Sequence, residues 1–283
     1  MKIPRLALAA MLTIAVAGAE AWPQAAPKGD LQGSAVAHTE KSAIGVIDGA
    51  QLALPAKAAG GMPYFGKWKD RPGTISGPVP VVVFLHGSSG LKLAAIADWQ
   101  KWLSEFGIAS VAPDSFALPD RLTYTSPIAR STYERIHELR ASEIAIALAA
   151  LKQADWVDPS RIVLAGTSEG ATAVARDGNS AFAARIVFSW SCEDNYFVEA
   201  HRTRVVADQP ILNVISSVDP FFSSANSWLD NPRAGGHCAA ALAEGKRAVV
   251  VLVPGAPHTL INMPYVRATT RAFLEVALGL GAK

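Results

Sequence analysis

The stretch Val79–Leu85 reads VPVVVFL and is the feature that most restricts the fold of this chain. It is too apolar and too rich in β-branched residues for a strand with one wet face, so it predicts a central strand covered on both sides. Similar apolar runs alternate along the chain with longer segments of helical periodicity. The expected strands lie at 79–85, 108–112, 161–165, 185–188, 211–216 and 248–253, and the expected helices at 93–106, 134–153, 169–176 and 265–278. This alternation predicts an α/β fold with a mostly parallel central sheet and helices on both faces.

Length and composition indicate one large globular domain. The chain has 283 residues, of which 50% are hydrophobic and 18% charged, which suffices for an extensive core. No repeat, low-complexity tract or interior linker divides it, so residues 43–283 are expected to form a single domain. The 26 basic and 24 acidic residues leave a formal charge of +2 without a basic run, so nucleic acid is not an expected partner.

The N-terminus has the three parts of a secretory signal peptide. Two basic residues precede a mostly apolar stretch at 6–19, and Ala19-Glu20-Ala21 is a small-x-small cleavage site. The apolar stretch is shorter than the ~20 residues that span a bilayer, and no later segment is apolar enough to do so. We therefore expect residues 1–21 to be removed and residues 22–42 to be a flexible lead-in. The mature chain is expected to be periplasmic or secreted, without a membrane span.

Export makes the two cysteines of the chain, Cys192 and Cys238, a candidate disulfide. Two buried free thiols are the other possibility. Neither cysteine lies in the sequence context of a nucleophile or of a metal-binding knuckle. On the chain-entropy model, a bridge over this separation stabilises a fold by about 4 kcal/mol.

A polar serine stands where the strand expected at 161–165 gives way to the helix expected at 169–176. The sequence Gly166-Thr167-Ser168-Glu169-Gly170 matches GxSxG, the nucleophile elbow, in the strand-turn-helix context that this motif requires. The glycines leave room for a tight turn, and the positive end of the helix dipole favours an oxyanion beside the hydroxyl. We interpret Ser168 as a catalytic nucleophile, and a serine that only caps the helix is the alternative.

A serine nucleophile needs a histidine base and a carboxylate that orients the base, and in this type of fold the chain order is serine, acid, histidine. Asp219 follows the strand expected at 211–216, and His258 follows the strand expected at 248–253. Both therefore lie at the carboxyl ends of strands, where open parallel sheets bind ligands. Rival acids are Glu193 and Asp194, and the histidines that fit the order or the loop position less well are His38, His137, His201 and His237.

An oxyanion hole needs two backbone amides aimed at one point. The amide of Glu169, next to the nucleophile, is expected to supply one. The sequence His86-Gly87-Ser88-Ser89-Gly90 follows the central strand, where esterases carry an HG-type motif. From it we choose the Ser88 amide, with Gly87 as the alternative, and interpret His86 as a structural member of the turn. No spaced set of His, Asp, Glu or Cys predicts a metal site and no GxGxxG follows the first strand, so no cofactor is expected.

These motifs together resemble a known superfamily. HGSSG, the PDSF at 113–116, RIVLAGTSEGA, Asp219 and the PGAPH that ends at His258 are similar to the α/β-hydrolases, in particular the dienelactone hydrolase-like branch. The similarity extends from about residue 44 to residue 278. A helix that carries Arg140 and Glu143 adds to it.

The resemblance implies acyl transfer to water, and a cysteine pair in some exported relatives supports a bridge between Cys192 and Cys238. Classical dienelactone hydrolases use a cysteine nucleophile, so Ser168 indicates a more general serine esterase. We expect a small-molecule carboxylic ester to be cleaved through a Ser-His-Asp triad and an acyl-enzyme. A serine peptidase, an acyltransferase and a non-catalytic binding protein are the alternatives.

The substrate side of the site is less specified. The segment at 189–210 is too short for a large cap domain, which predicts an open site. Aromatic residues near the acid and the cysteines could line a pocket or could equally be core. That group comprises Trp190, Tyr196, Phe197, Phe221, Phe222 and Trp228, while Phe116 and Leu118 are candidates for the opposite wall. The candidates chosen for substrate binding are Phe116, Trp190, Phe221 and Phe222.

Overall fold

The computed structural model of the chain describes residues 28–204, 206–226 and 229–281. Its centre is an eight-stranded sheet with the spatial order β10-β9-β8-β7-β4-β5-β2-β3. Neighbouring strands pair in parallel except at one edge, where β2 is antiparallel to both β5 and β3. The strands are β2 (Gln51–Leu54), β3 (Tyr64–Lys67), β4 (Val79–Leu85), β5 (Ala109–Ala112), β7 (Val157–Thr167), β8 (Ala184–Phe188), β9 (Ile211–Ser216) and β10 (Ala248–Val253). The mostly parallel sheet that the sequence predicts is confirmed.

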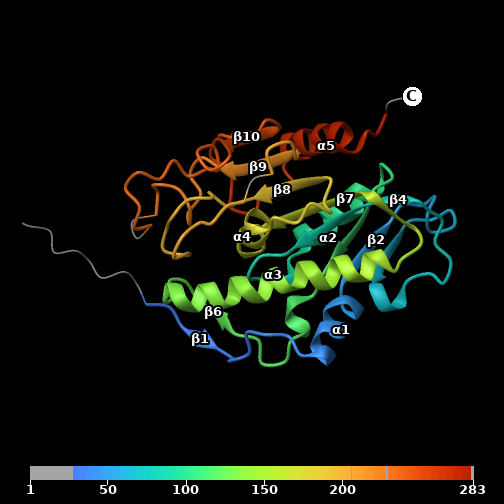
Figure 1. Cartoon of the computed structure of the whole chain (residues 1–283), viewed down its shortest axis with the longest axis horizontal. Coiled ribbons are helices and arrows are strands. Elements are labelled where there is room, and N and C mark those ends of the chain that lie inside the picture. The colour runs from blue at the N-terminus through green and yellow to red at the C-terminus, as the bar shows by residue number, and fades with distance from the viewer. Residues whose placement is uncertain (1–27, 205, 227–228, 282–283) are drawn as a thin grey trace, which may run out of the picture.

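Helices cover both faces of this sheet. Figure 1 shows α3 running along one side of it and α5, in red, on the other side. The helices are α1 (Glu40–Asp48), α2 (Ala94–Ser104), α3 (Arg130–Lys152), α4 (Glu169–Arg176) and α5 (Pro264–Leu278), with short 3-10 turns η1 (Trp68–Asp70), η2 (Gly90–Lys92) and η3 (Ser115–Ala117). Within the described ranges, none of these helices has the length and apolar character needed to cross a membrane.

Strand β4 shows why both faces of the sheet are apolar. All of its residues are buried, and alternate side chains of a strand point to opposite faces. Val81 and Val83 belong to the apolar cluster that includes residues of α3 and α4. Val82 and Phe84 belong to the other cluster, in which the Phe84 ring lies 4.9 Å from the ring of Trp99 in α2. The interpretation of VPVVVFL as a central strand covered on both sides is confirmed.

The first described segment corrects the prediction of a flexible lead-in at 22–42. Strand β1 (Leu31–Gln32) pairs antiparallel with β6 (Thr123–Tyr124), and α1 begins at Glu40, inside the predicted lead-in. Thr39 caps α1 by accepting a hydrogen bond from the Ser42 amide. Backbone pairing and a cap hold this segment without any hydrophobic periodicity, which is why the pattern did not reveal it. The predicted signal peptide at 1–21 and residues 22–27 lie outside the described residues.

Several boundaries differ from expectation. Helix α3 begins at Arg130 rather than at residue 134, and β7 covers residues 157–167 rather than 161–165. Strands β2 and β3 form a hairpin that the sequence pattern did not indicate. Between β8 and β9, residues 189–204 and 206–210 hold no helix and no strand beyond one isolated bridge. That part of the chain therefore inserts no large cap domain, as expected.

Candidate active site

Three strands carry the predicted catalytic residues to one edge of the sheet. Ser168 directly follows β7, Asp219 lies in the loop after β9, and His258 lies in the loop after β10. Parallel strands end at the same edge, so the loops that follow them meet there. Ser168 and His258 line one cavity of about 90 Å³, and Asp219 contacts His258. The structure thus brings together three residues that are far apart in the sequence.

Ser168 has a backbone conformation that few side chains tolerate, with φ 53° and ψ −121°. Such a positive φ marks a strained turn at a residue other than glycine. A Cβ on Gly166 would lie 2.9 Å from the Gly170 backbone, and a Cβ on Gly170 would lie 2.3 Å from the carbonyl oxygen of Leu85. Only glycine fits at either position. The Ser168 side chain makes no capping hydrogen bond to α4, so the geometry is that of a nucleophile elbow rather than a helix cap.

Asp219 is wholly buried and orients the histidine. Its Oδ2 lies 2.7 Å from His258 Nδ1, and its Oδ1 accepts hydrogen bonds from the amides of Phe221 and Phe222 at 2.9 and 3.2 Å. A carboxylate only accepts, so Nδ1 is the donor. This leaves Nε2 as the unprotonated nitrogen of the neutral ring.

The rival acids bind elsewhere. The Glu193 carboxylate accepts hydrogen bonds from the amides of Gly235 and Gly236 at 2.8 and 3.0 Å, and Asp194 accepts one from the His201 amide at 2.8 Å. The remaining candidate histidines have partners other than Ser168, namely Ser42 and Glu143 for His38, the Phe197 carbonyl for His137, Thr203 for His201 and the Ala239 amide for His237.

The loop after β4 passes directly over the nucleophile. A Cβ on Gly87 would lie 3.3 Å from the Cβ of Ser168, and Gly87 and Ser88 line the same cavity as the serine. Glu169 is the first residue of α4, so its amide has no acceptor within the helix. The residues chosen for the oxyanion hole therefore all lie next to Ser168, Gly87 and Ser88 in space and Glu169 in the chain.

His86 and Arg140 hold this loop. His86 Nε2 accepts a hydrogen bond from the Ser115 amide at 3.2 Å, so Nδ1 carries the proton and donates to the Gly87 carbonyl at 2.7 Å. Burial, followed by the positive charge of Arg140, holds the pKa of His86 well below its usual value, so the ring is neutral. Arg140 Nη2 donates to the His86 carbonyl at 2.8 Å. The carbonyls of His86 and Gly87 are thus held in place. Because each peptide group is planar, this also fixes the directions of the Gly87 and Ser88 amides.

Behind Ser168 lies a buried ionic network that the sequence pattern did not reveal. The Glu169 side chain is wholly buried, and its carboxylate accepts from Arg121 at 2.7 Å and from the Tyr124 hydroxyl at 2.8 Å. Arg140 Nε lies 3.6 Å from the same carboxylate. Burial by itself raises the pKa of Glu169, but the charges of Arg121 and Arg140, together with the hydrogen bond from Tyr124, lower it, and the net result is a pKa below its usual value. Glu169 is therefore ionised at neutral pH.

Arg140 extends the network to the N-terminal segment. Its Nη1 lies 3.0 Å from Glu143 in the next turn of α3, and Glu143 lies 3.3 Å from His38. The only signal in the sequence was the Arg140 and Glu143 pair three residues apart on a helix. Their partners come from distant segments, so the place of Arg140 beside the loop after β4, residues 86–90 and here called the oxyanion loop, could be found only in the structure.

The fold of this chain is similar to that of several solved structures. A Klebsiella pneumoniae subsp. pneumoniae protein assigned as a dienelactone hydrolase has a TM-score of 0.53 and 14% identity, with 82% of this chain and 98% of that chain covered. Est1E from Butyrivibrio proteoclasticus, with ferulic acid bound, has a TM-score of 0.51 and 19% identity over 83% and 95%. A cold-adapted esterase from an Arctic intertidal metagenomic library has a TM-score of 0.51 and 15% identity, with 81% of this chain and 95% of that chain covered. The chain has the α/β-hydrolase fold. No family model matches the sequence, and no curated protein matches it.

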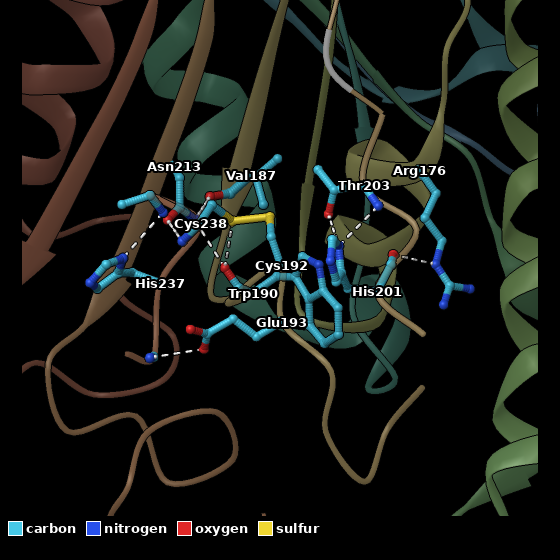
Figure 2. The surroundings of a disulfide bond; sticks show 12 residues. Arg176, Val187, Trp190, Cys192, Glu193, His201, Thr203, Asn213, His237 and Cys238 are labelled. Carbon is cyan, nitrogen blue, oxygen red and sulfur yellow. Dashed lines mark hydrogen bonds between the residues drawn. A yellow bond between two sulfur atoms is a disulfide. The ribbon is translucent and has the colours of Figure 1, made fainter. Parts of the chain in front are cut away.

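A dienelactone hydrolase and two esterases are thus among the proteins that this chain is similar to in fold. The disulfide between Cys192 and Cys238 is present (Figure 2). It links the loop after β8 to the segment that precedes β10. The buried side chain of Asn213, in β9, donates to the Trp190 carbonyl and accepts from the Cys238 amide, both at 3.0 Å. The bridge therefore braces the strand that leads to Asp219.

Two adjoining cavities open at the edge of the sheet that holds Ser168 and His258. Phe221 and Phe222 line the cavity of Ser168, as do Tyr196 and Phe197. Phe116 instead lines a larger cavity beside it.

Trp190 is a correction to the predicted pocket wall. It is wholly buried, and its ring packs against Phe222 at 5.0 Å, so it belongs to the core behind the cleft. Leu118, which the sequence placed with the wall, is also buried. Trp228 lies outside the described residues.

Proposed function

We propose that this chain is a serine hydrolase that cleaves carboxylic esters through an acyl-enzyme. The proposal is carried by one observation: His258, which lines the same cavity as the strained Ser168, has its Nδ1 2.7 Å from the buried Asp219. The α/β-hydrolase fold hosts many activities, so the argument comes from the site. The esterases and the dienelactone hydrolase among the structural neighbours agree with it.

The first half of the reaction forms the acyl-enzyme. Ser168 Oγ forms a bond to the ester carbonyl carbon while His258 Nε2 takes the hydroxyl proton. Asp219 stabilises the resulting imidazolium through Nδ1–H. The carbonyl oxygen becomes an oxyanion that accepts hydrogen bonds from the amides of Glu169 and Ser88, with Gly87 as the alternative donor. When the tetrahedral intermediate collapses, the bond to the alcohol oxygen breaks, and Nε2–H gives its proton to that oxygen.

The second half regenerates the serine. A water molecule gives a proton to His258 Nε2 as its oxygen bonds to the acyl carbon. The same amides hold the second oxyanion. The bond between Ser168 Oγ and the acyl carbon then breaks, Oγ receives the proton from Nε2, and the carboxylic acid leaves. The Est1E structure contains ferulic acid, an aromatic carboxylic acid, which makes aromatic esters a suitable part of the first substrate panel.

We also propose that the chain is exported, with cleavage after Ala21. The signal-peptide pattern at 1–21 and the disulfide both support this, because disulfides persist in oxidising compartments. N-terminal sequencing of protein recovered outside the cytoplasm tests it. Recovery only from the cytoplasm, with the leader intact, would contradict it.

Labelling with a fluorophosphonate followed by peptide mapping tests the hydrolase proposal. The probe requires an activated serine but presupposes no substrate. We expect a stoichiometric adduct on Ser168 that His258→Ala abolishes, and roughly 10⁶-fold lower kcat in Ser168→Ala with an ester substrate. Folded protein without an adduct would refute the proposal and favour a binding protein.

A further inference from the structure

The larger cavity beside the catalytic one measures about 680 Å³. It lies between the hairpin of β2 and β3, the oxyanion loop with η2, and the turn after β5. Ser88, Ser89 and Gly90 line both cavities, so the two meet at the oxyanion loop. The catalytic cavity, at about 90 Å³, holds little more than the reacting carbonyl, whereas ligand pockets measure roughly 300–1,000 Å³. The bulk of a substrate therefore needs a second space, and the adjoining cavity has the required size.

The order of strands in the sheet decides which half of an ester this cavity receives. Along the sheet, the loops carry His258 and Asp219 after β10 and β9, then Ser168 after β7, then the oxyanion loop after β4. The large cavity lies beyond that loop, over β5, β2 and β3. The alcohol oxygen must lie beside His258 to receive its proton, so the alcohol extends toward β10. The acyl group and the oxyanion take the directions that point away from the histidine, and the large cavity opens on that side of the carbonyl carbon.

The lining of this cavity indicates what acyl group fits. Phe65 and Phe116 contribute two partly exposed rings, with 36% and 42% of their surfaces accessible. Ionisable side chains in the wall are two lysines, Lys67 and Lys92, against one acid, Asp114. The wall therefore offers aromatic contacts and an excess of positive charge, and Lys67 lies on β3, the outermost strand.

We propose that this cavity is the acyl pocket of the enzyme and takes a bulky aromatic acyl group that carries an anionic group at its distal end. The inference rests on the proposed hydrolase function. Phe65 and Phe116 bind the ring, and Lys67 and Lys92 attract the anion. Phe65 lies on the hairpin rather than in the oxyanion loop, so it can be changed without touching the reacting atoms.

The test compares p-nitrophenyl esters that share one leaving group and differ only in the acyl group: acetate, phenylpropanoate and para-carboxyphenylpropanoate. In the wild type we expect the highest kcat/KM for the carboxylated ester. Phe65→Ala should lower kcat/KM for both aromatic esters about tenfold and for acetate less than about twofold. Met62→Ala is the matched control, because Met62 is an exposed apolar residue before the same hairpin strand and does not line the cavity. It should change none of the three values.

Charge reversal tests the anionic group. Lys67→Glu with Lys92→Glu should lower kcat/KM about fivefold for the carboxylated ester and leave the phenylpropanoate unchanged. Lys152→Glu, at the exposed end of α3, is the charge control and should affect neither ester. An equal loss on both aromatic esters would overturn the assignment of the anion.

Naphthyl acetate, with its bulk on the alcohol side, separates the two orientations. Sensitivity of its hydrolysis to Phe65→Ala, with the aromatic acyl esters unaffected, would overturn the acyl assignment. So would a wild type that labels at Ser168 and hydrolyses acetate but shows no preference for aromatic acyl groups. Absence of both labelling and acetate hydrolysis would instead refute the hydrolase function itself.

Discussion

The two sides of Ser168 are held by different means. On the side of the oxyanion loop, the supports are buried charges, with Arg140 between the Glu169 carboxylate and the His86 carbonyl. On the side of the base, the supports are the disulfide and neutral hydrogen bonds from serine and asparagine side chains. Ser216 donates to the Ala256 carbonyl at 2.6 Å, and the Asn213 amide braces the bridge.

The difference follows from the architecture around each side. The charged side chains beside the oxyanion loop come from α3, α4 and the turn after η3, and they are buried in a dry interior. The segment between β9 and β10 is long and irregular, so a cross-link that limits its unfolded conformations has a large effect there. One side should therefore be vulnerable to loss of charge and the other to loss of a covalent bond.

Of the changes that separate the two sides of Ser168, we expect the largest effect from one that lowers activity on the side of the base without lowering stability. Asp219→Asn should lower kcat by about 10⁴-fold, because the amide no longer holds His258 in the reactive tautomer. The free energy of unfolding should change by less than about 1 kcal/mol, because the Asn oxygen can still accept from the backbone amides. Steady-state kinetics and urea unfolding measure the two quantities. A loss of kcat below tenfold would mean that another acid orients the histidine.

Removing the disulfide should have the next largest effect, and it should act on stability. The double variant Cys192→Ser with Cys238→Ser should lose about 4 kcal/mol of unfolding free energy and roughly 10 °C in Tm. Differential scanning calorimetry with and without reductant measures it. The reductant should destabilise the wild type and leave the double variant unchanged. Equal Tm values for wild type and variant would show that the bridge does not brace the base side.

Arg140→Lys weakens the buried ionic network beside the oxyanion loop. Lysine keeps the charge but lacks the planar fork of donors, so about 2 kcal/mol of stability and about tenfold in kcat should be lost, with KM unchanged. The control is Arg176→Lys, because Arg176 forms a two-pronged pair with Glu134, at 2.7 and 3.0 Å, away from the oxyanion loop. That variant should lose stability but keep kcat. Equal losses of kcat in both variants would contradict a positioning role for Arg140.

Acid perturbs the α3 side gradually rather than in one step. Burial is the main cause that lowers the pKa of His137 from 6.5 to about 4. Between these values the unfolded chain binds a proton that the folded chain does not, so stability falls as the pH decreases through that window. The slope is about 1.4 kcal/mol per pH unit. His137→Gln should remove this contribution while the two proteins stay parallel above pH 7. Urea unfolding as a function of pH measures it, and identical slopes below pH 6.5 would contradict it.

The features that could be predicted from the sequence are those that depend on residues close together in the chain. Strand β4 followed from its uninterrupted apolar run, and the elbow followed from two glycines around Ser168 between a strand and a helix. Asp219 and His258 followed from chain order and from their positions after strands. The choice of Asp219 over Glu193 required the structure, because Glu193 is bound by glycine amides some forty residues away in the chain.

Features that depend on distant partners were missed. The ion pair of Arg121 and Glu169 joins a turn after η3 to the elbow, and no periodic pattern in the sequence predicts it. The pairing of β1 with β6 uses backbone groups, so residue types carry little signal. Trp190 was assigned to a pocket wall because aromatic residues after strands suit both a wall and the core, and only burial separates the two.

The place of β3 at the sheet edge bears on how the proposed activity could change over evolutionary time. The hairpin of β2 and β3 joins the sheet only through β5, while the proposed catalytic groups lie in the loops after β4, β7, β9 and β10. Exposed edge segments tolerate insertion and replacement better than central strands do. Lineages could therefore lengthen or recompose this hairpin and acquire new ester preferences while the reaction itself stays the same.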